Sequence, residues 1–249
     1  MHYLIYFATT AIGFIAGFIN TLAGSGSILT LPMLMFAGLD ANTANGTNRI
    51  GILLQSIVGV ASFKKKQIFT FRETRWLVIP SLVGSFFGSA MAANIDKELM
   101  TKTISVLMFL LFFVILFQPE KWVREQAKTL SDKPNFLKIV IFFCVGFYAG
   151  FIQAGIGVFI LASLVLGAGL DLVKANAIKI LIILLLTPIA LAVFIYHRQV
   201  DFFMGAVLGF GNMLGAWVAT KFAMEWGVRY IRYLLLLIVF ISAIKLMFF

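Results

Sequence analysis

Two cations stand inside long apolar segments of this chain, at nearly corresponding positions. Arg49 and Lys179 each lie a turn or two beyond a Gly-Leu-Asp corner, at 38–40 and 169–171 respectively. A cation at bilayer depth costs about 2.5–3.5 kcal/mol on insertion scales, so it normally faces a cavity or a partner. No acidic residue falls inside the long apolar runs. The two cations could therefore neutralise a bound anion, although snorkelling towards a lipid headgroup is the alternative.

Uncharged polar side chains accompany the cations at matching positions. Asn20 and Gln153 end two similar segments, and Asn45 and Asn176 belong to a second matched pair. Amides and hydroxyls can bond the oxygens of an oxyanion, or they can bond one helix to another. The predicted substrate-binding residues are Asn20, Asn45, Thr47, Asn48, Arg49, Gln153, Asn176 and Lys179.

Glycine-rich interruptions are expected to position these side chains. One lies at 24–27 (Gly-Ser-Gly-Ser) and the other at 155–157 (Gly-Ile-Gly). Glycine and serine favour turns, and unpaired backbone in a membrane is tolerated only inside protein or beside a watery cavity. Helices that start after such breaks would direct N–H groups at an anion, whereas the alternative is that the glycines are packing notches. The predicted break glycines are Gly24, Gly26, Gly155 and Gly157.

The chain carries an internal repeat. GFIAGFIN at 13–20 matches GFYAGFIQ at 146–153, with six of eight positions identical and an offset of 133 residues. GLDANTANGTNRI at 38–50 is answered by GLDLVKANAIKIL at 169–181, offset by 131, so the second copy lacks two residues, expected at the break. Broken hydrophobic segments at corresponding places in two halves are typical of a transporter's binding site.

Composition places the chain in a membrane. Hydrophobic residues make up 61% and charged residues 12%, with a mean hydropathy of +1.02. A soluble domain carries about twice that charge, so an all-α polytopic membrane protein is predicted. The formal charge of +10 sits between the apolar runs, which favours orientation by basic loops and contact with anionic lipid over nucleic-acid binding. A single cysteine and two isolated histidines predict no metal site, no cofactor and no enzyme.

Each half is expected to hold a glycine-broken helix pair followed by three transmembrane helices. The predicted domains are a first transmembrane repeat at 1–118, a cytoplasmic linker at 119–135 and a second transmembrane repeat at 136–249. The predicted helices are about 3–22, 28–38, 42–63, 76–94, 103–118, 136–154, a short helix to 168, 174–196, 202–222 and 229–248.

Basic residues predict the orientation of the chain. Loops 64–75 and 119–135 are rich in lysine and arginine and should be cytoplasmic, as should the segment 221–232. That assignment predicts repeats of opposite orientation. If each broken pair crosses the membrane only once, however, the repeats would be parallel. Gly-x-x-x-Gly faces, as at Gly13 and Gly17, could serve internal packing or a homodimer.

With these motifs the chain resembles the TauE/SafE family of sulfite-exporter-like permeases, also called toluene sulfonate uptake permeases. The likeness covers essentially the whole chain. Its matching pieces are Gly13-Phe14 with Gly17, Gly24-Ser25-Gly26, Pro32-Met33-Leu34, Gly38-Leu39, Ala44-Asn45-Gly46-Thr47-Asn48, and in the second half 146–157 and Ala175-Asn176. The chain departs from the family pattern at Ser25 and Ser27, where more glycine is common, and in its truncated second break.

The resemblance implies a multi-pass permease of the bacterial cytoplasmic (inner) membrane. Such a protein would move sulfur-containing or carboxylated organic anions, such as sulfite, sulfoacetate or other organosulfonates. The family name implies an exporter, although members differ in substrate and direction.

Three functional alternatives stay open at the level of sequence. A secondary transporter with alternating access fits the repeat and the cations, and the chain contains no G-x-x-x-x-G-K-[ST] motif for ATP binding. A passive anion channel would need the same cations. A non-transporting membrane assembly subunit would not need them at all.

Overall fold

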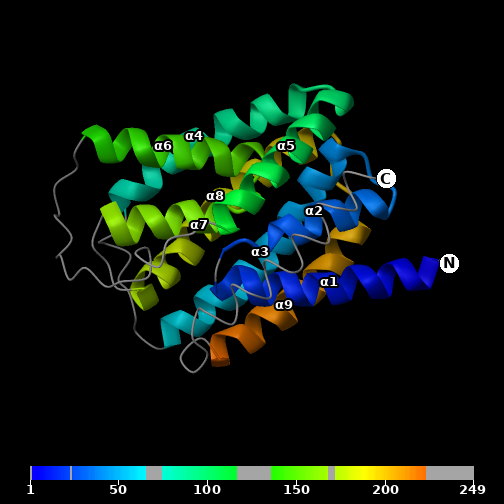
Figure 1. The fold of residues 1–249 in the computed structure, drawn as a ribbon, viewed down its shortest axis with the longest axis horizontal. Helices are drawn as coiled ribbons and strands as arrows, with labels where there is room; N and C mark the ends of the chain where they lie inside the picture. The colour runs from blue at the N-terminus through cyan, green and yellow to red at the C-terminus, as the bar shows by residue number, and fades with distance from the viewer. Residues whose placement is uncertain (1, 23, 66–74, 117–135, 168–171, 223–249) are drawn as a thin grey trace.

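The computed structural model describes residues 2–22, 24–65, 75–116, 136–167 and 172–222. Every element assigned in these ranges is a helix, and the helices lie side by side along the long axis of the molecule (Figure 1). They are α1 (His2–Leu22), α2 (Ser27–Phe36), α3 (Ala41–Lys65), α4 (Arg75–Asn94), α5 (Lys97–Leu116), α6 (Phe136–Phe151), α7 (Ile156–Ala162), a π-helical turn (Ser163–Gly167), α8 (Leu172–Tyr196) and α9 (Phe202–Phe222).

Membrane-spanning length and an apolar exterior confirm the polytopic class. Within the described ranges, four helical stretches are long and apolar enough to cross a bilayer: Tyr3–Leu22, Leu77–Asn94, Lys174–Tyr196 and Phe202–Lys221. The outward faces carry large apolar side chains that are half exposed or more, which suits contact with lipid tails. Among them are Phe7, Phe86, Phe87, Met91, Phe210 and Trp217.

The first glycine break reverses the chain. The N–H of Gly24 donates to the carbonyl of Ile19, and Gly26 lies against the last turns of α1. Further along, Leu34 of α2 is buried in a cluster that includes Ile5 and Tyr6 from the start of α1. α1 and α2 therefore form an antiparallel hairpin. The break turns the chain back instead of interrupting a single crossing.

The first helix packs most closely against a helix of the second half. A Cβ atom at Gly211 would lie 2.1 Å from the carbonyl oxygen of Thr10, and one at Gly215 would lie 2.0 Å from that of Phe14. Only glycine permits this approach, and the equal spacing shows that α1 and α9 run parallel.

The same contact recurs between α4 and α6. A Cβ at Gly84 would lie 2.2 Å from the carbonyl oxygen of Phe143, and one at Gly88 would lie 2.0 Å from that of Phe147. Phe143 and Phe147 follow Thr10 and Phe14 by 133 residues, the offset of the sequence repeat. The first helix of each half is thus packed on the other half. The boundary at 119–135, which lies outside the described residues, divides the sequence but not the packing.

The two helices that carry the cations cross in opposite directions. Gly46 of α3 lies against the carbonyl of Gln199, just beyond α8, and Gly59 of α3 lies against Ile180 of α8. As residue numbers rise along α3, those of its neighbours on α8 fall. α3 and α8, which hold matching sequences, are therefore antiparallel.

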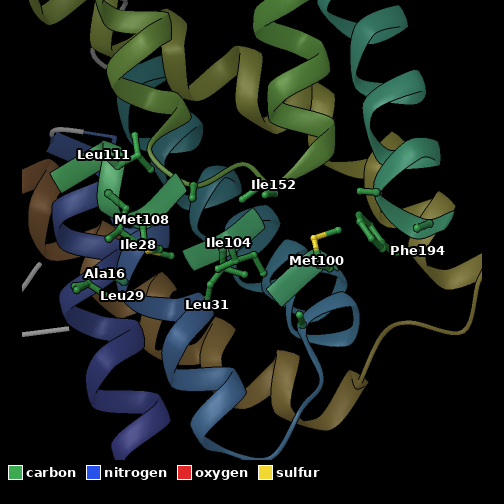
Figure 2. Close-up of a cluster of buried hydrophobic side chains, with 14 of the residues drawn as sticks. Ala16, Ile28, Leu29, Leu31, Met100, Ile104, Met108, Leu111, Ile152 and Phe194 are labelled. Carbon is green, nitrogen blue, oxygen red and sulfur yellow. The ribbon is translucent and has the colours of Figure 1, made fainter. Parts of the chain in front are cut away.

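Helix α5 closes the centre of the molecule. Its apolar face, from Met100 to Leu111, packs on α2 and on the second break, with Ala16 and Ile152 in the same buried cluster (Figure 2). Through this cluster, both breaks pack against the same helix, α5.

Two predicted boundaries were wrong. α5 begins at Lys97 and not near 103, because Asp96 caps it by accepting a hydrogen bond from the N–H of Leu99 (2.9 Å), and Glu98 pairs with Lys102 within the first turns. α6 ends at Phe151 and not near 154, where a left-handed residue, Gln153, follows. The predicted helix at 229–248 and the core of loop 64–75 lie outside the described residues.

We expect a large side chain at a glycine of the α4–α6 contact or of the α1–α9 contact to destabilise the protein. Gly88→Leu and Gly215→Leu should each lower the unfolding free energy by about 1–3 kcal/mol, because the side chain would meet backbone that cannot move aside. Ala206→Leu, on the lipid-facing side of α9, is the matched control and should change little. The measurement is thermal unfolding in detergent. Equal midpoints for the glycine variants and the control would contradict the packing.

Candidate functional site

Arg49 is fully buried and holds the end of α6. Its Nη1 donates to the carbonyl of Ala149 and to Oε1 of Gln153 (2.7 Å), and its Nη2 donates to the carbonyl of Gly150 (2.8 Å) and to Oδ1 of Asn45 (3.1 Å). Two of these acceptors are backbone carbonyls in the last turn of α6, which have no partner within the helix. The guanidinium of α3 therefore caps the C-terminus of a helix from the other half.

Lys179 does the same for α1. Its buried Nζ donates to the carbonyls of Asn20 (3.0 Å) and Thr21 (3.3 Å) and to Oδ1 of Asn176. The amide nitrogen of Asn176 donates to the carbonyl of Thr21 as well (2.9 Å). The ammonium of α8 and its neighbour thus satisfy the carbonyl end of the first helix.

Neutral acceptors solvate these charges but do not cancel them. The ion pairs between two described side chains, Lys97 with Asp40 and Lys102 with Glu98, lie outside this region. A helix C-terminus is equivalent to roughly −0.5 elementary charge, so about half of each positive charge remains. Counted over the described residues, the two cations and the two helix ends therefore sum to a net positive charge.

The two breaks touch each other. The N–H of Gly157 donates to the carbonyl of Gly24 (3.0 Å), and a Cβ on either glycine would overlap the backbone of the other. Gly24 and Gly155 also adopt left-handed backbone, with φ of 82° and 65°, which side-chain-bearing residues rarely do. Gln153 also adopts the left-handed conformation (φ 64°), which is unfavourable for a residue with a side chain and is maintained here by the surrounding structure. Both caps therefore lie beside one contact at the centre of the fold.

Comparison with known proteins places the chain in a family. The sulfite exporter TauE/SafE family profile matches residues 9–246. The chain belongs to the TauE/SafE family. It is 27% identical over 237 residues to the probable membrane transporter protein ORF9 of Sinorhizobium sp., covering 94% of this chain and 89% of that one. It is 25% identical to the probable membrane transporter protein YfcA of Escherichia coli K12 (95% and 87% covered) and to YdhB of Bacillus subtilis (88% and 89% covered).

The TauE/SafE chain brings six of the eight predicted residues into the two caps. Asn45, Arg49 and Gln153 form one cap, and Asn20, Asn176 and Lys179 form the other. Asn20 contributes its backbone carbonyl to the cap. Whether any of these residues binds substrate stays a prediction.

The remaining two predicted residues lie outside the caps. Oδ1 of Asn48 accepts from the hydroxyl of Thr30 on α2 (2.7 Å), so Asn48 faces the short helix. Thr47 accepts from the backbone N–H of Asp201 at the start of α9 (2.9 Å), an interhelical bond. Thr47 therefore has a structural partner away from the breaks.

Sequence reasoning missed supporting groups on both sides of the second break. Thr187 accepts from the amide nitrogen of Gln153 (3.1 Å), and the hydroxyl of Tyr148 donates to the carbonyl of Ala154 (2.7 Å). A threonine directly before Pro188 in an otherwise apolar run was the available signal for the first. Tyr148 gave none, because an aromatic residue in a membrane helix is ordinary.

We expect loss of a capping cation to destabilise the ligand-free protein. Lys179→Met should lower the unfolding free energy by about 2–4 kcal/mol, because buried carbonyls of Asn20 and Thr21 lose a charged donor. Lys102→Met removes an exposed pair worth about 0.3–0.5 kcal/mol and serves as the control. Thermal unfolding in detergent measures both. An unchanged midpoint for Lys179→Met would show that the cap does not hold α1.

Proposed function

We propose that this chain is a secondary transporter, most simply an exporter, of small sulfur-containing or organic anions such as sulfite, sulfoacetate or other organosulfonates. The observation that carries the proposal is the pair of fully buried cations, one from each half, beside the contact between two chain breaks. Neither cation pairs with a carboxylate among the described residues. The family name adds sulfite as a substrate class.

Electrostatics favour an anion over a cation or a neutral solute. Two half-compensated positive charges in a medium of low dielectric attract a negative substrate and repel a cation. Substrate entry would displace or share some of the capping bonds, so binding and rearrangement of the helix ends would be coupled.

Inverted repeats supply a route for alternating access. The matched helices α3 and α8 are antiparallel, and the packing contacts recur at the repeat offset, which supports an inverted duplication. The moving units in this proposal are the close pairs α1–α9 and α4–α6, each built from both halves. They would rock about α3 and α8, and the anion would sit between them.

The proposed location is the bacterial inner membrane with the basic ends in the cytoplasm. The last residues of α3, the start of α4, the start of α8 and the end of α9 lie at one side of the molecule (Figure 1), and Lys174 and Lys221 belong to the last two of these helix ends. The positive-inside rule assigns that side to the cytoplasm. The opposite end carries the Asp40–Lys97 pair.

Anion binding is tested by thermal shift. Sulfite, sulfate, sulfoacetate, taurine and short carboxylates are added to the purified protein, and one anion at about 100-fold its Kd should stabilise it by about 2.7 kcal/mol. Arg49→Gln and Lys179→Gln should lose that increment, whereas Lys102→Gln keeps it. An anion that stabilises all four proteins equally would assign the cations to helix capping alone.

Counterflow separates a transporter from a passive channel. Proteoliposomes preloaded with the unlabelled anion should take up the labelled anion faster than empty ones, because a carrier returns faster when loaded. A channel would show uptake that follows the membrane potential and no acceleration by preloading.

A further inference from the structure

The two breaks differ chemically although each contains a Gly-x-Gly sequence. With Gly24 and Gly26 aligned to Gly155 and Gly157, an offset of 131, Ser25 and Ser27 of the first break are replaced by Ile156 and Val158 in the second. All four of these side chains are buried. The first break is therefore hydroxyl-rich and the second apolar, so a ligand that needs hydrogen bonds has partners on one side only.

Two buried polar groups beside the first break have no partner. The hydroxyl of Ser25 is fully buried and forms no hydrogen bond. The amide nitrogen of Asn48, also fully buried, forms none, whereas its oxygen is fixed by Thr30 in the first turns of α2. Buried polar groups are nearly always satisfied, and leaving a donor empty is unfavourable. Nε of Arg49 is a third unpartnered donor, one residue further along α3.

Ser25 and Asn48 lie at the beginning of a ten-residue helix, α2, Ser25 just before it and Asn48 against Thr30. Gly26 is the N-cap of α2 and provides no side-chain capping bond. The N–H groups of Ile28 and Leu29 donate to the carbonyls of Ser25 and Gly26, so the positive end of the helix acts on this region through its dipole. The negative end of α1 lies alongside in the hairpin, and there Lys179 offsets it. Because Lys179 offsets the negative end of α1, that end no longer opposes the positive N-terminal end of α2.

We propose that the anion binds at the N-terminus of α2, held by Ser25, the amide nitrogen of Asn48 and the helix N-terminal dipole, off the axis that relates the two halves. This proposal rests on the proposed function and deepens it. The oxygen of Asn48 is occupied by Thr30, so its free atom here is a donor, and no acidic side chain of the described residues pairs with it. The subsite therefore selects fully deprotonated oxyanions and rejects an ammonium group, so isethionate should bind at least about tenfold tighter than its amino analogue, taurine.

The test compares two buried serines in the full-length protein. Ser25→Ala should weaken binding of [35S]sulfite, [35S]sulfate and isethionate about tenfold, the size of one hydrogen bond to a charged group. The unfolding midpoint without anion should not fall, because the hydroxyl has no partner to lose. Ser56→Ala on α3 is the matched control: its hydroxyl is equally buried and unpartnered, and its binding should equal that of the wild type.

A second variant reverses the sign of the subsite. Asn48→Asp keeps an oxygen for Thr30 and replaces the free donor by a negative oxygen, so anion binding should disappear. Wild-type affinity in Ser25→Ala or in Asn48→Asp, or an equal loss in Ser25→Ala and Ser56→Ala, overturns the α2 subsite while anion transport stands. If the wild-type protein binds none of the three anions and counterflow is absent, both the subsite and the proposed function fail.

Discussion

Backbone carbonyls that end inside a membrane protein must find donors, and this requirement shapes the whole molecule. α1 and α6 both stop at an interior break, where the residues that carry their last carbonyls are buried. A cation donates hydrogen bonds to each helix end, Lys179 to α1 and Arg49 to α6. The amide groups of Asn176 and Asn45 donate further bonds to the same two ends. A charged donor is suited to this because it offers several N–H groups and also opposes the helix dipole.

The origin of each cation explains why the halves interlock. Lys179 lies on α8 and caps a helix of the first half, and Arg49 lies on α3 and caps a helix of the second. Neither half can satisfy its own break. The glycine contacts of α1 with α9 and of α4 with α6 bring the helices close enough for the exchange, and the Gly24–Gly157 contact fixes the two breaks against each other.

Sequence was sufficient for the class, for the approximate positions of the described helices and for the two breaks, because hydropathy and glycine-serine runs act locally. It identified Arg49 and Lys179 as unusual but could not name their acceptors, since main-chain carbonyls leave no trace in residue types. The start of α5 was missed because an N-cap such as Asp96 resembles a loop residue until the helix is seen. Ser25 and Thr30 were passed over as turn and helix residues, and their relation to Asn48 depends on the hairpin.

The long sequence separation between Arg49 and its acceptors affects how the chain can insert into the membrane during synthesis. Ala149 follows Arg49 by 100 residues and Gln153 by 104. At about 5–20 residues per second, the ribosome needs roughly 5–20 s to make the intervening chain. During that interval α3 carries an unsatisfied guanidinium, so the nascent helix must wait in the translocon, at the headgroup level or beside another chain before it settles. Lateral release of the first five helices would thus be timed by the arrival of the sixth.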